Sequence, residues 1–184
     1  MINQNFELER ETENSASLLK FDSALKTAVK LLSKRDFSTL GMKDALSRLE
    51  YDEPCISDVI EHLLQVNYLD DERLAINLLK KYVGRGKGPH YIKNEFFKRG
   101  LVFSMESYRQ FLLNEGVTSS DHMLTTLERA ARKYLNKCDS SYDFERKVLS
   151  YLFRQGQIQD QSEIGLYKST LRQLWSSKEI QGSN

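Results

Sequence analysis

Apolar residues recur along most of the chain at the three- and four-residue spacing of an amphipathic helix. Representative stripes are Ala24, Leu25, Ala28, Val29, Leu31 and Leu32, then Leu74, Ala75, Leu78, Leu79 and Tyr82, then Ile164, Tyr167, Leu171 and Leu174. Only two prolines and nine glycines interrupt the 184 residues. The pattern therefore predicts helices and argues against a sheet.

Nine helices are predicted, near residues 22–34, 39–49, 55–66, 71–83, 89–99, 104–114, 121–137, 142–155 and 160–175. The expected N-caps are Ser38, Ser104 and Asp160, the last in a capping box with Glu163, and the expected C-caps are Gly100, Gly116 and Gly156. Pro89 suits a first helical position, because that position needs no hydrogen bond from its nitrogen.

Segments of the chain can be superposed as repeats at offsets of 50 and then 56 residues. The superposed positions are Met42, Ile92 and Val148, then Leu46, Phe96 and Leu152, then Glu50, Gly100 and Gly156. A unit of this length holds three helices and buries its own apolar faces poorly, so neighbouring units must share a core. We predict an all-α fold of three tandem three-helix repeats stacked into an elongated curved body.

The predicted repeats are residues 21–69, 70–118 and 119–176, between a flexible N-terminal segment at 1–20 and a flexible C-terminal tail at 177–184. No apolar run approaches the roughly 18 residues that span a bilayer, and the first residues do not resemble a signal peptide. The only cysteines, Cys55 and Cys138, form no CxxC pair and suggest reduced thiols. We therefore expect a cytoplasmic protein with no membrane partner.

Charge is distributed unevenly although the net charge is only +1. Eight acidic residues and no lysine or arginine lie within residues 50–72. Residues 80–99 contain seven lysines and arginines and a single acidic residue, Glu95. The sequence thus predicts an acidic surface beside a basic one, and the near-neutral total argues against a protein that acts by binding DNA alone.

No sequence motif indicates catalysis. The glycine-rich loop at 84–89 lacks the Ser or Thr that follows the lysine of a phosphate-binding loop, and it follows a helix rather than a strand. His62, His90 and His122 have no cysteines at zinc-ligand spacing. We expect no enzyme activity, no cofactor and no metal.

Several aromatic residues lie at helical spacing with aliphatic ones and are predicted to belong to the core. They are Phe96, Phe97, Tyr134, Tyr151, Phe153 and Trp175. Stacking on nucleic-acid bases is the alternative interpretation.

The segment at 68–101 resembles a known family. The matching runs are Tyr68-Leu69-Asp70-Asp71-Glu72-Arg73-Leu74-Ala75, Arg85-Gly86-Lys87-Gly88-Pro89 and Arg99-Gly100-Leu101, with weaker agreement at Arg35-Asp36-Phe37-Ser38 and Leu46 and at Lys147, Leu152 and Arg154-Gln155-Gly156. These motifs resemble the RecX regulators of bacterial recombination. The resemblance covers roughly residues 22–175 and departs from the family pattern at Leu49-Glu50-Tyr51, where Arg-Gly is usual, and at Gln155.

The resemblance implies a protein without catalysis that binds the RecA filament in its helical groove and restrains ATP hydrolysis, strand exchange and coprotease activity. The resemblance also implies an affinity for single- or double-stranded DNA. We expect this protein to be a monomer. The candidate contact residues are Arg85, Lys87, Lys93, Lys98, Arg99, Arg132, Lys133, Arg146, Lys147 and Arg154. Two alternatives stay open, namely a stand-alone helix-turn-helix-like DNA-binding protein, whose affinity falls steeply with salt, and a purely structural adaptor.

Overall fold

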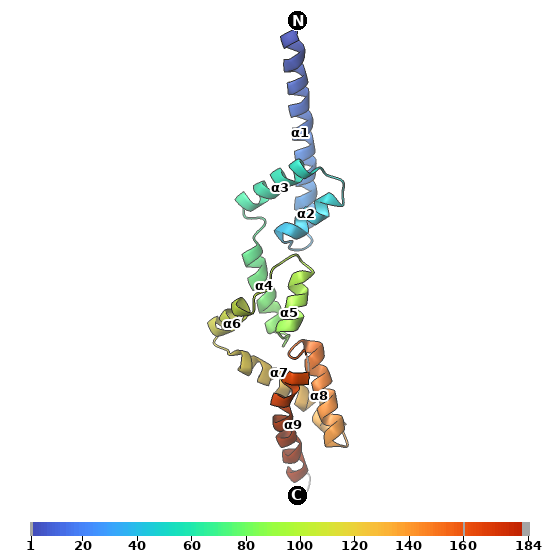
Figure 1. Ribbon diagram of the computed structural model, residues 1–184, viewed down its shortest axis with the longest axis vertical. Helices are drawn as coiled ribbons and strands as arrows, with labels where there is room; N and C mark the ends of the chain where they lie inside the picture. Colours follow the sequence, from blue (N-terminus) through green and yellow to red (C-terminus); the bar gives the residue numbers. More distant parts are fainter. Residues whose placement is uncertain (1, 160, 182–184) are drawn as a thin grey trace. The chain divides into compact units, whose positions relative to one another are not determined.

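The computed structural model describes residues 2–159 and 161–181, which contain nine α-helices, one short 3-10 helix and no strand (Figure 1). The helices are α1 Ile2–Leu32, α2 Thr39–Ser47, α3 Glu53–Gln65, α4 Asp71–Val83, α5 Pro89–Phe97, α6 Met105–Asn114, α7 Ser119–Tyr134, η1 Leu135–Lys137, α8 Ser141–Gln155 and α9 Gln161–Gln181. The predicted all-helical fold is confirmed. None of the helices described is long and apolar enough to cross a membrane.

The first and last helices are longer than predicted. The helix expected to begin near residue 22 begins at Ile2 instead, and α9 continues to Gln181. Residues 2–21 contain no glycine or proline, so nothing in the sequence stops the helix from extending. The predicted mobility of residues 1–20 and 177–184, whose ends lie outside the described residues, stays a prediction.

The predicted N-caps Ser38 and Ser104 and the predicted C-cap Gly156 are confirmed, whereas the C-cap of α6 is Glu115, one residue before the predicted Gly116. The hydroxyls of Ser38 and Ser104 accept hydrogen bonds from backbone amides inside α2 and α6, and α5 begins at Pro89. Gly100, Gly116 and Gly156 have φ angles of 69°, 73° and 69°, the left-handed conformation of a C-cap. The capping box of Asp160 and Glu163 lies outside the described residues. Further caps, which the sequence analysis missed, are Asp52, Thr118 and Ser140.

The repeat found in the sequence is visible in the backbone. The apolar positions superposed across the repeats are all buried, at Met42, Leu46, Ile92, Phe96, Val148 and Leu152. The backbone at the third superposed position is left-handed in every repeat. This position is Glu50, with a φ of 64°, in the first repeat and Gly100 and Gly156 in the others. In the last repeat α8 has 15 residues, whereas its counterpart α5 has 9.

The chain divides into two compact units. The first contains residues Met1–Ala75 with Lys98–Leu101, and the second contains Ile76–Phe97 with Val102–Asn184. The core of the first unit is built by α1, α2 and α3 around residues such as Met42, Val59 and Leu63. Within the second unit, α7, α8 and α9 enclose a core that includes Phe144, Leu171 and Trp175.

Candidate functional site

In the first unit, the beginning of α2 lies against the segment that follows α5. The Ser38 hydroxyl, besides capping α2, donates a hydrogen bond to the carbonyl of Arg99. A Cβ atom on Gly41 would lie 3.5 Å from the same carbonyl oxygen. A Cβ on Gly100 would lie 3.0 Å from the side chain of Leu40. We call this contact the first junction.

In the second unit, the beginning of α5 lies against the end of α8 in the same way. The amide of Gly88 donates to the carbonyl of Gln155 over 2.8 Å, and the amide of His90 donates to the carbonyl of Gly156 over 3.2 Å. A Cβ on Gly88 would approach the Cα of Gln157 to 2.6 Å, so only glycine fits. We call this contact the second junction.

The two junctions are copies of one arrangement. Ser38 and Gly88 are 50 residues apart, Arg99 and Gln155 are 56 apart, and in each copy the earlier residue donates to the carbonyl of the later one. These are the offsets of the sequence repeat. The copies therefore place equivalent surface side chains beside each junction.

A hollow of about 140 Å³ lies at the first junction. Its charged lining consists of Arg35, Asp36, Asp44, Arg48, Lys98 and Arg99. The Arg35 guanidinium lies 4.3 Å from the centre of the Phe37 ring, which holds its position over an aromatic face. Four cations against two carboxylates make this first hollow basic, and it brings together two of the predicted contact residues, Lys98 and Arg99.

A larger hollow, of about 360 Å³, lies at the second junction. Its lining consists of His90, Tyr91, Lys93, Asn94, Phe153, Arg154, Gly156, Ile158 and Gln159. It brings together the predicted contact residues Lys93 and Arg154, both exposed, and none of the lining residues that the structure describes is a carboxylate. The second hollow is therefore suited to an anionic ligand.

The backbone of the glycine-rich loop at 84–89 is hydrogen-bonded both to the end of α4 and to the side chain of Gln157. The amides of Gly86 and Lys87 donate to carbonyls at the end of α4, over 2.8 and 2.9 Å. The Gln157 side chain, which is buried, donates to the carbonyl of Gly86 and to the Thr126 hydroxyl, both over 3.2 Å. These hydrogen bonds fix the backbone of the loop that contains the predicted contact residues Arg85 and Lys87. Arg85 is exposed, and the Lys87 ammonium lies 4.2 Å from the centre of the Tyr91 ring.

A buried histidine joins α7 to the end of α4. His122 Nε2 donates to the carbonyl of Val83 over 3.2 Å, which leaves Nδ1 to accept from the Tyr108 hydroxyl at 3.0 Å. Burial lowers the pKa of His122 and raises the pKa of Tyr108 to about 12. Both groups are therefore neutral near pH 7, and their role is to fix the packing below the glycine-rich loop.

The remaining predicted contact residues lie on α7 and α8, outside both hollows. Arg132 is exposed and lies 3.6 Å from Glu128 on the same helix. The Lys133 ammonium lies 5.2 Å from the Tyr134 ring centre and 5.5 Å from that of Tyr151. These two cations face solvent with only weak local interactions.

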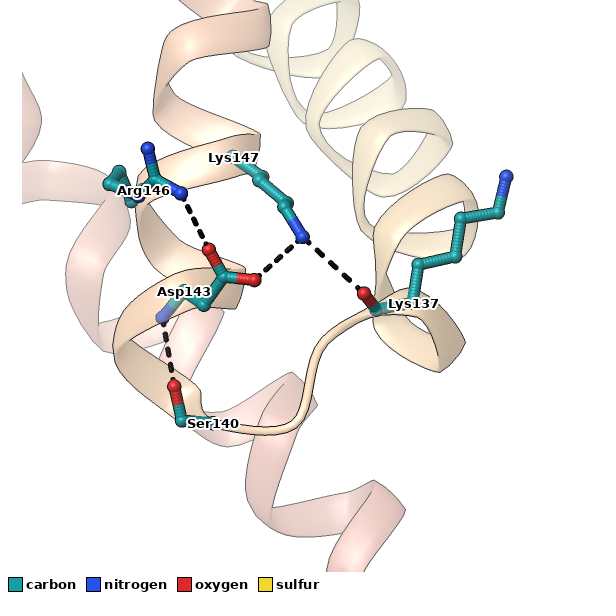
Figure 2. A network of polar contacts seen from close by, with 5 residues as sticks. All are labelled: Lys137, Ser140, Asp143, Arg146 and Lys147. Atoms are coloured by element: carbon teal, nitrogen blue, oxygen red, sulfur yellow. Dashed lines mark hydrogen bonds and ion pairs between the residues drawn. The ribbon is translucent and has the colours of Figure 1, made fainter.

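Arg146 and Lys147 belong to a polar network at the beginning of α8 (Figure 2). Asp143 accepts from Arg146 over 2.8 Å and from Lys147 over 2.6 Å, and Lys147 also donates to the carbonyl of Lys137 over 3.4 Å. The ammonium of Lys147 and then the guanidinium of Arg146 lower the pKa of Asp143 to about 2. Both cations therefore have a structural partner within the fold.

The core prediction for the aromatic residues is confirmed for some and wrong for others. Phe96 and Trp175 are buried, and Tyr134 and Tyr151 are half-buried against the core. Phe97 and Phe153 are exposed, at 84% and 59% of their surface. Each follows a buried residue, Phe96 or Leu152, and successive helical residues point about 100° apart, so only one of each pair faces the core.

The sequence analysis missed Arg35 and Arg48 as members of a basic site. The signal was present in the repeat, because Arg35 lies 50 residues before Arg85 and Arg48 lies 50 before Lys98. The acidic segment that begins at Glu50 predicts an acidic surface in the first repeat, yet its carboxylates do not line the first hollow.

No protein-family model matches the chain. The chain is 31% identical to a regulatory protein RecX of Vibrio parahaemolyticus over 83 residues, which are 45% of this chain and 54% of that protein. It is 26% identical to a regulatory protein RecX of Mannheimia succiniciproducens over 134 residues, which are 72% of this chain and 85% of that protein. The match thus spans about half of the Vibrio protein's length and most of the other's.

Solved structures show the same fold. The crystal structure of RecX from Lactobacillus salivarius has a TM-score of 0.63 at 20% identity, covering 85% of this chain and 97% of that chain. The chain therefore has the fold of the solved RecX structures. A second crystal structure, of a regulatory protein RecX, has a TM-score of 0.67 at 16% identity and covers 88% of this chain and 77% of that chain.

The residues that resemble the RecX family serve mainly to build the junctions. Asp70 accepts from the amide of Arg73 over 2.8 Å and so caps the beginning of α4. Asp71 accepts from the amide of Thr39 over 2.7 Å, which ties the first turn of α4 to α2. Gly88 and Gly100 supply the close backbone contacts described above.

Proposed function

We propose that this chain is a regulator that binds the RecA nucleoprotein filament in its helical groove and restrains the recombinase, ATPase and coprotease activities of RecA. It acts as a cytoplasmic monomer without catalysis of its own. The similarity to regulatory proteins named RecX supports the regulatory role. The observation that carries the proposal is the pair of basic hollows at equivalent junctions. A filament presents its partner with repeating sites, and a chain with two copies of one surface can engage two of them.

The cations of the hollows are the proposed contacts, with Arg85 and Lys87 beside them. Lys93 and Arg154 are exposed and line the second hollow, where none of the described lining residues is a carboxylate, so their charges favour a partner's anionic groups. Arg132 and Lys133 are proposed to add long-range attraction, because they are exposed on α7. Arg146 and Lys147 are proposed to contribute less, since Asp143 already engages them.

The test is the rate of ATP hydrolysis by RecA on single-stranded DNA, measured against increasing amounts of this protein. The Lys93→Ala/Arg154→Ala variant should need roughly tenfold more protein for half-inhibition, because two charge-assisted contacts are lost. Arg109→Ala/Lys168→Ala removes the same charge from exposed positions outside both hollows and should inhibit like the wild type. No inhibition by the folded wild-type protein in excess over its own RecA would refute the proposal.

The second candidate is the stand-alone DNA-binding protein, which the basic hollows also favour. It differs in requiring no RecA, so it should hold duplex DNA on its own with an affinity that falls steeply with salt. A gel-shift titration with duplex DNA at two salt concentrations separates the candidates. Tight duplex binding together with no effect on RecA would select this second function.

A further inference from the structure

We propose that Gln157 is a positioning residue, through which the third repeat sets the conformation of the glycine-rich loop of the second repeat. This loop, at 84–89, contains Arg85 and Lys87, two of the proposed contacts with the partner. The inference rests on the proposed function and deepens it, because it names what controls this contact. The control is a buried side chain of the neighbouring repeat.

Gln157 departs from the pattern of the repeats. The equivalent residues, at the offsets of 50 and 56, are Tyr51 and Leu101, which are larger in apolar surface and half-buried. Gln157 is 7% exposed, and burying an amide is unfavourable unless the protein replaces its hydrogen bonds to water. A polar side chain at an otherwise apolar position therefore indicates a specific hydrogen-bonding role in the third repeat.

The amide of Gln157 has its partners in the loop and on α7. Its Nε2 atom donates over 3.2 Å to the carbonyl of Gly86 and over 3.2 Å to the hydroxyl of Thr126. The Thr126 hydroxyl donates to the carbonyl of His122 over 3.1 Å, so its oxygen is left to accept from Gln157. The backbone amide of Gln157 donates to the carbonyl of Leu152 over 3.0 Å. The end of α8 and the face of α7 thus fix the side chain that contacts the loop.

The hydrogen bond to Gly86 orients one peptide group of the loop. The carbonyl of Gly86 and the amide of Lys87 belong to the same planar group. Gln157 donates to this carbonyl, and the amide donates to the carbonyl of Tyr82 over 2.9 Å, so both edges of the plane are held. Gly86 has a φ of 71°, and a glycine allows the backbone many other conformations. Gln157 therefore selects one of them, and with it the direction of the neighbouring side chains Arg85 and Lys87.

The third repeat also supplies the surface beneath the loop. His122, Thr126 and Arg129 are four and three residues apart, so they lie on one face of α7. His122 donates to the carbonyl of Val83, where the loop begins. A Cβ atom on Gly86 would lie 3.0 Å from the Arg129 guanidinium and 3.2 Å from the Thr126 hydroxyl. All of these residues belong to the second compact unit, and together they hold the loop backbone in place.

This arrangement couples the third repeat to partner binding by the second. A loop that is already ordered in the free protein loses less conformational entropy when it binds. The affinity contributed by Arg85 and Lys87 should therefore depend on Gln157, although Gln157 is buried and contacts no partner itself.

The first test follows hydrogen exchange of the loop amides in Gln157→Met, without RecA. Methionine keeps the approximate length of the side chain and removes its donors. The amide of Lys87 should exchange roughly 2- to 10-fold faster, because a hydrogen bond that orders its peptide group is lost. Thr126→Val, which removes only the second partner of the amide, should have a smaller effect in the same direction and serves if Gln157→Met does not fold. Gln110→Met is the matched control, because Gln110 is an exposed glutamine of α6 that bonds Asn114, and it should leave the loop unchanged.

The second test separates positioning from a general loss of stability, by inhibition of ATP hydrolysis by RecA. Gln157→Met should raise the amount of protein needed for half-inhibition roughly 2- to 10-fold. The same change in Arg85→Ala/Lys87→Ala should have an effect of less than about twofold, because the loop then lacks the cations that Gln157 positions. An equal loss in both backgrounds, or wild-type exchange of the Lys87 amide in Gln157→Met, overturns the inference. Absence of inhibition by the wild-type protein refutes the proposed function instead, and the exchange rate of the Lys87 amide still decides the role of Gln157.

Discussion

Glu50 has a left-handed backbone conformation at the end of α2, with a φ of 64°. The equivalent positions in the other repeats are glycines, which adopt this conformation without strain. A side chain with a Cβ meets its own carbonyl there, at a cost of roughly 1–2 kcal/mol. The first repeat therefore makes the same turn as the others with glutamate in place of glycine, the residue best suited to this conformation.

Replacing Glu50 with glycine should raise the free energy of unfolding by about 0.5–1 kcal/mol, because the relief of strain exceeds the entropy that glycine adds to the unfolded chain. Urea denaturation followed by circular dichroism measures the change. Leu49→Gly is the control, because Leu49 is exposed and its φ is negative, so the same added entropy should lower stability. Equal destabilisation by both variants would contradict the assignment of strain at Glu50.

Individual residues show what the sequence could and could not predict about the site. The glycines and caps were predictable because each solves a local backbone problem. The exposure of Phe97 and Phe153 was not, because apolar spacing locates a helix face only to within one residue. Lys147 lies four residues after Asp143 on one predicted helix, so this ion pair could have been predicted from the spacing. Only the fold brings Lys147 to the carbonyl of Lys137.

At the scale of elements, α8 begins with the polar network of Asp143 and two cations (Figure 2). The carboxylate also lies in the first turn of the helix, where a negative charge is favoured. The folded protein holds the pKa of Asp143 at about 2, below the unfolded value of 3.8. The resulting stabilisation is present above pH 4, roughly, and is lost as the pH falls toward 2.

Asp143→Asn should therefore lower stability at pH 6 and flatten its dependence on pH between about 5 and 2. Lys147→Met should do the same, and Arg146→Met should have a smaller effect, in the order in which the two cations lower the pKa of Asp143. The midpoint of urea unfolding at pH 6 and at pH 3 is the measurement. An unchanged difference between the two midpoints in Asp143→Asn would show that this carboxylate plays no part in the acid response.

Helix boundaries were predictable where a cap or glycine marks them, as at Ser38 and Gly156. The beginning of α1 was not, because residues 2–21 contain neither a stop signal nor an apolar stripe of their own. The alternation of charged and polar residues there is compatible with a helix as well as with a flexible segment. Sequence spacing alone does not choose between them.

At the scale of the whole molecule, one junction is used twice. Offsets of 50 and 56 residues relate the partners of the two junctions, and Lys98 of the first hollow and Arg154 of the second are likewise 56 residues apart. The offsets were found from apolar positions, whereas the hollows depend on which helix ends meet, which the sequence did not reveal. Repetition of a binding surface suits a partner that is itself a polymer, since a second contact then forms at high effective concentration.

The most direct test of the central claim, that the junction cations hold the protein on the filament, is an affinity measurement on RecA filaments assembled on surface-bound single-stranded DNA. Arg35→Glu and Arg154→Glu each reverse one charge in one hollow. Either alone should leave partial binding, and the two together should weaken binding roughly 100-fold, because both contacts are lost. The control variant Arg109→Glu/Lys168→Glu, with equal charge change outside the hollows, should bind like the wild type. If the control loses as much affinity as the junction variant, or the junction variant binds like the wild type, the junctions are not the contact surface.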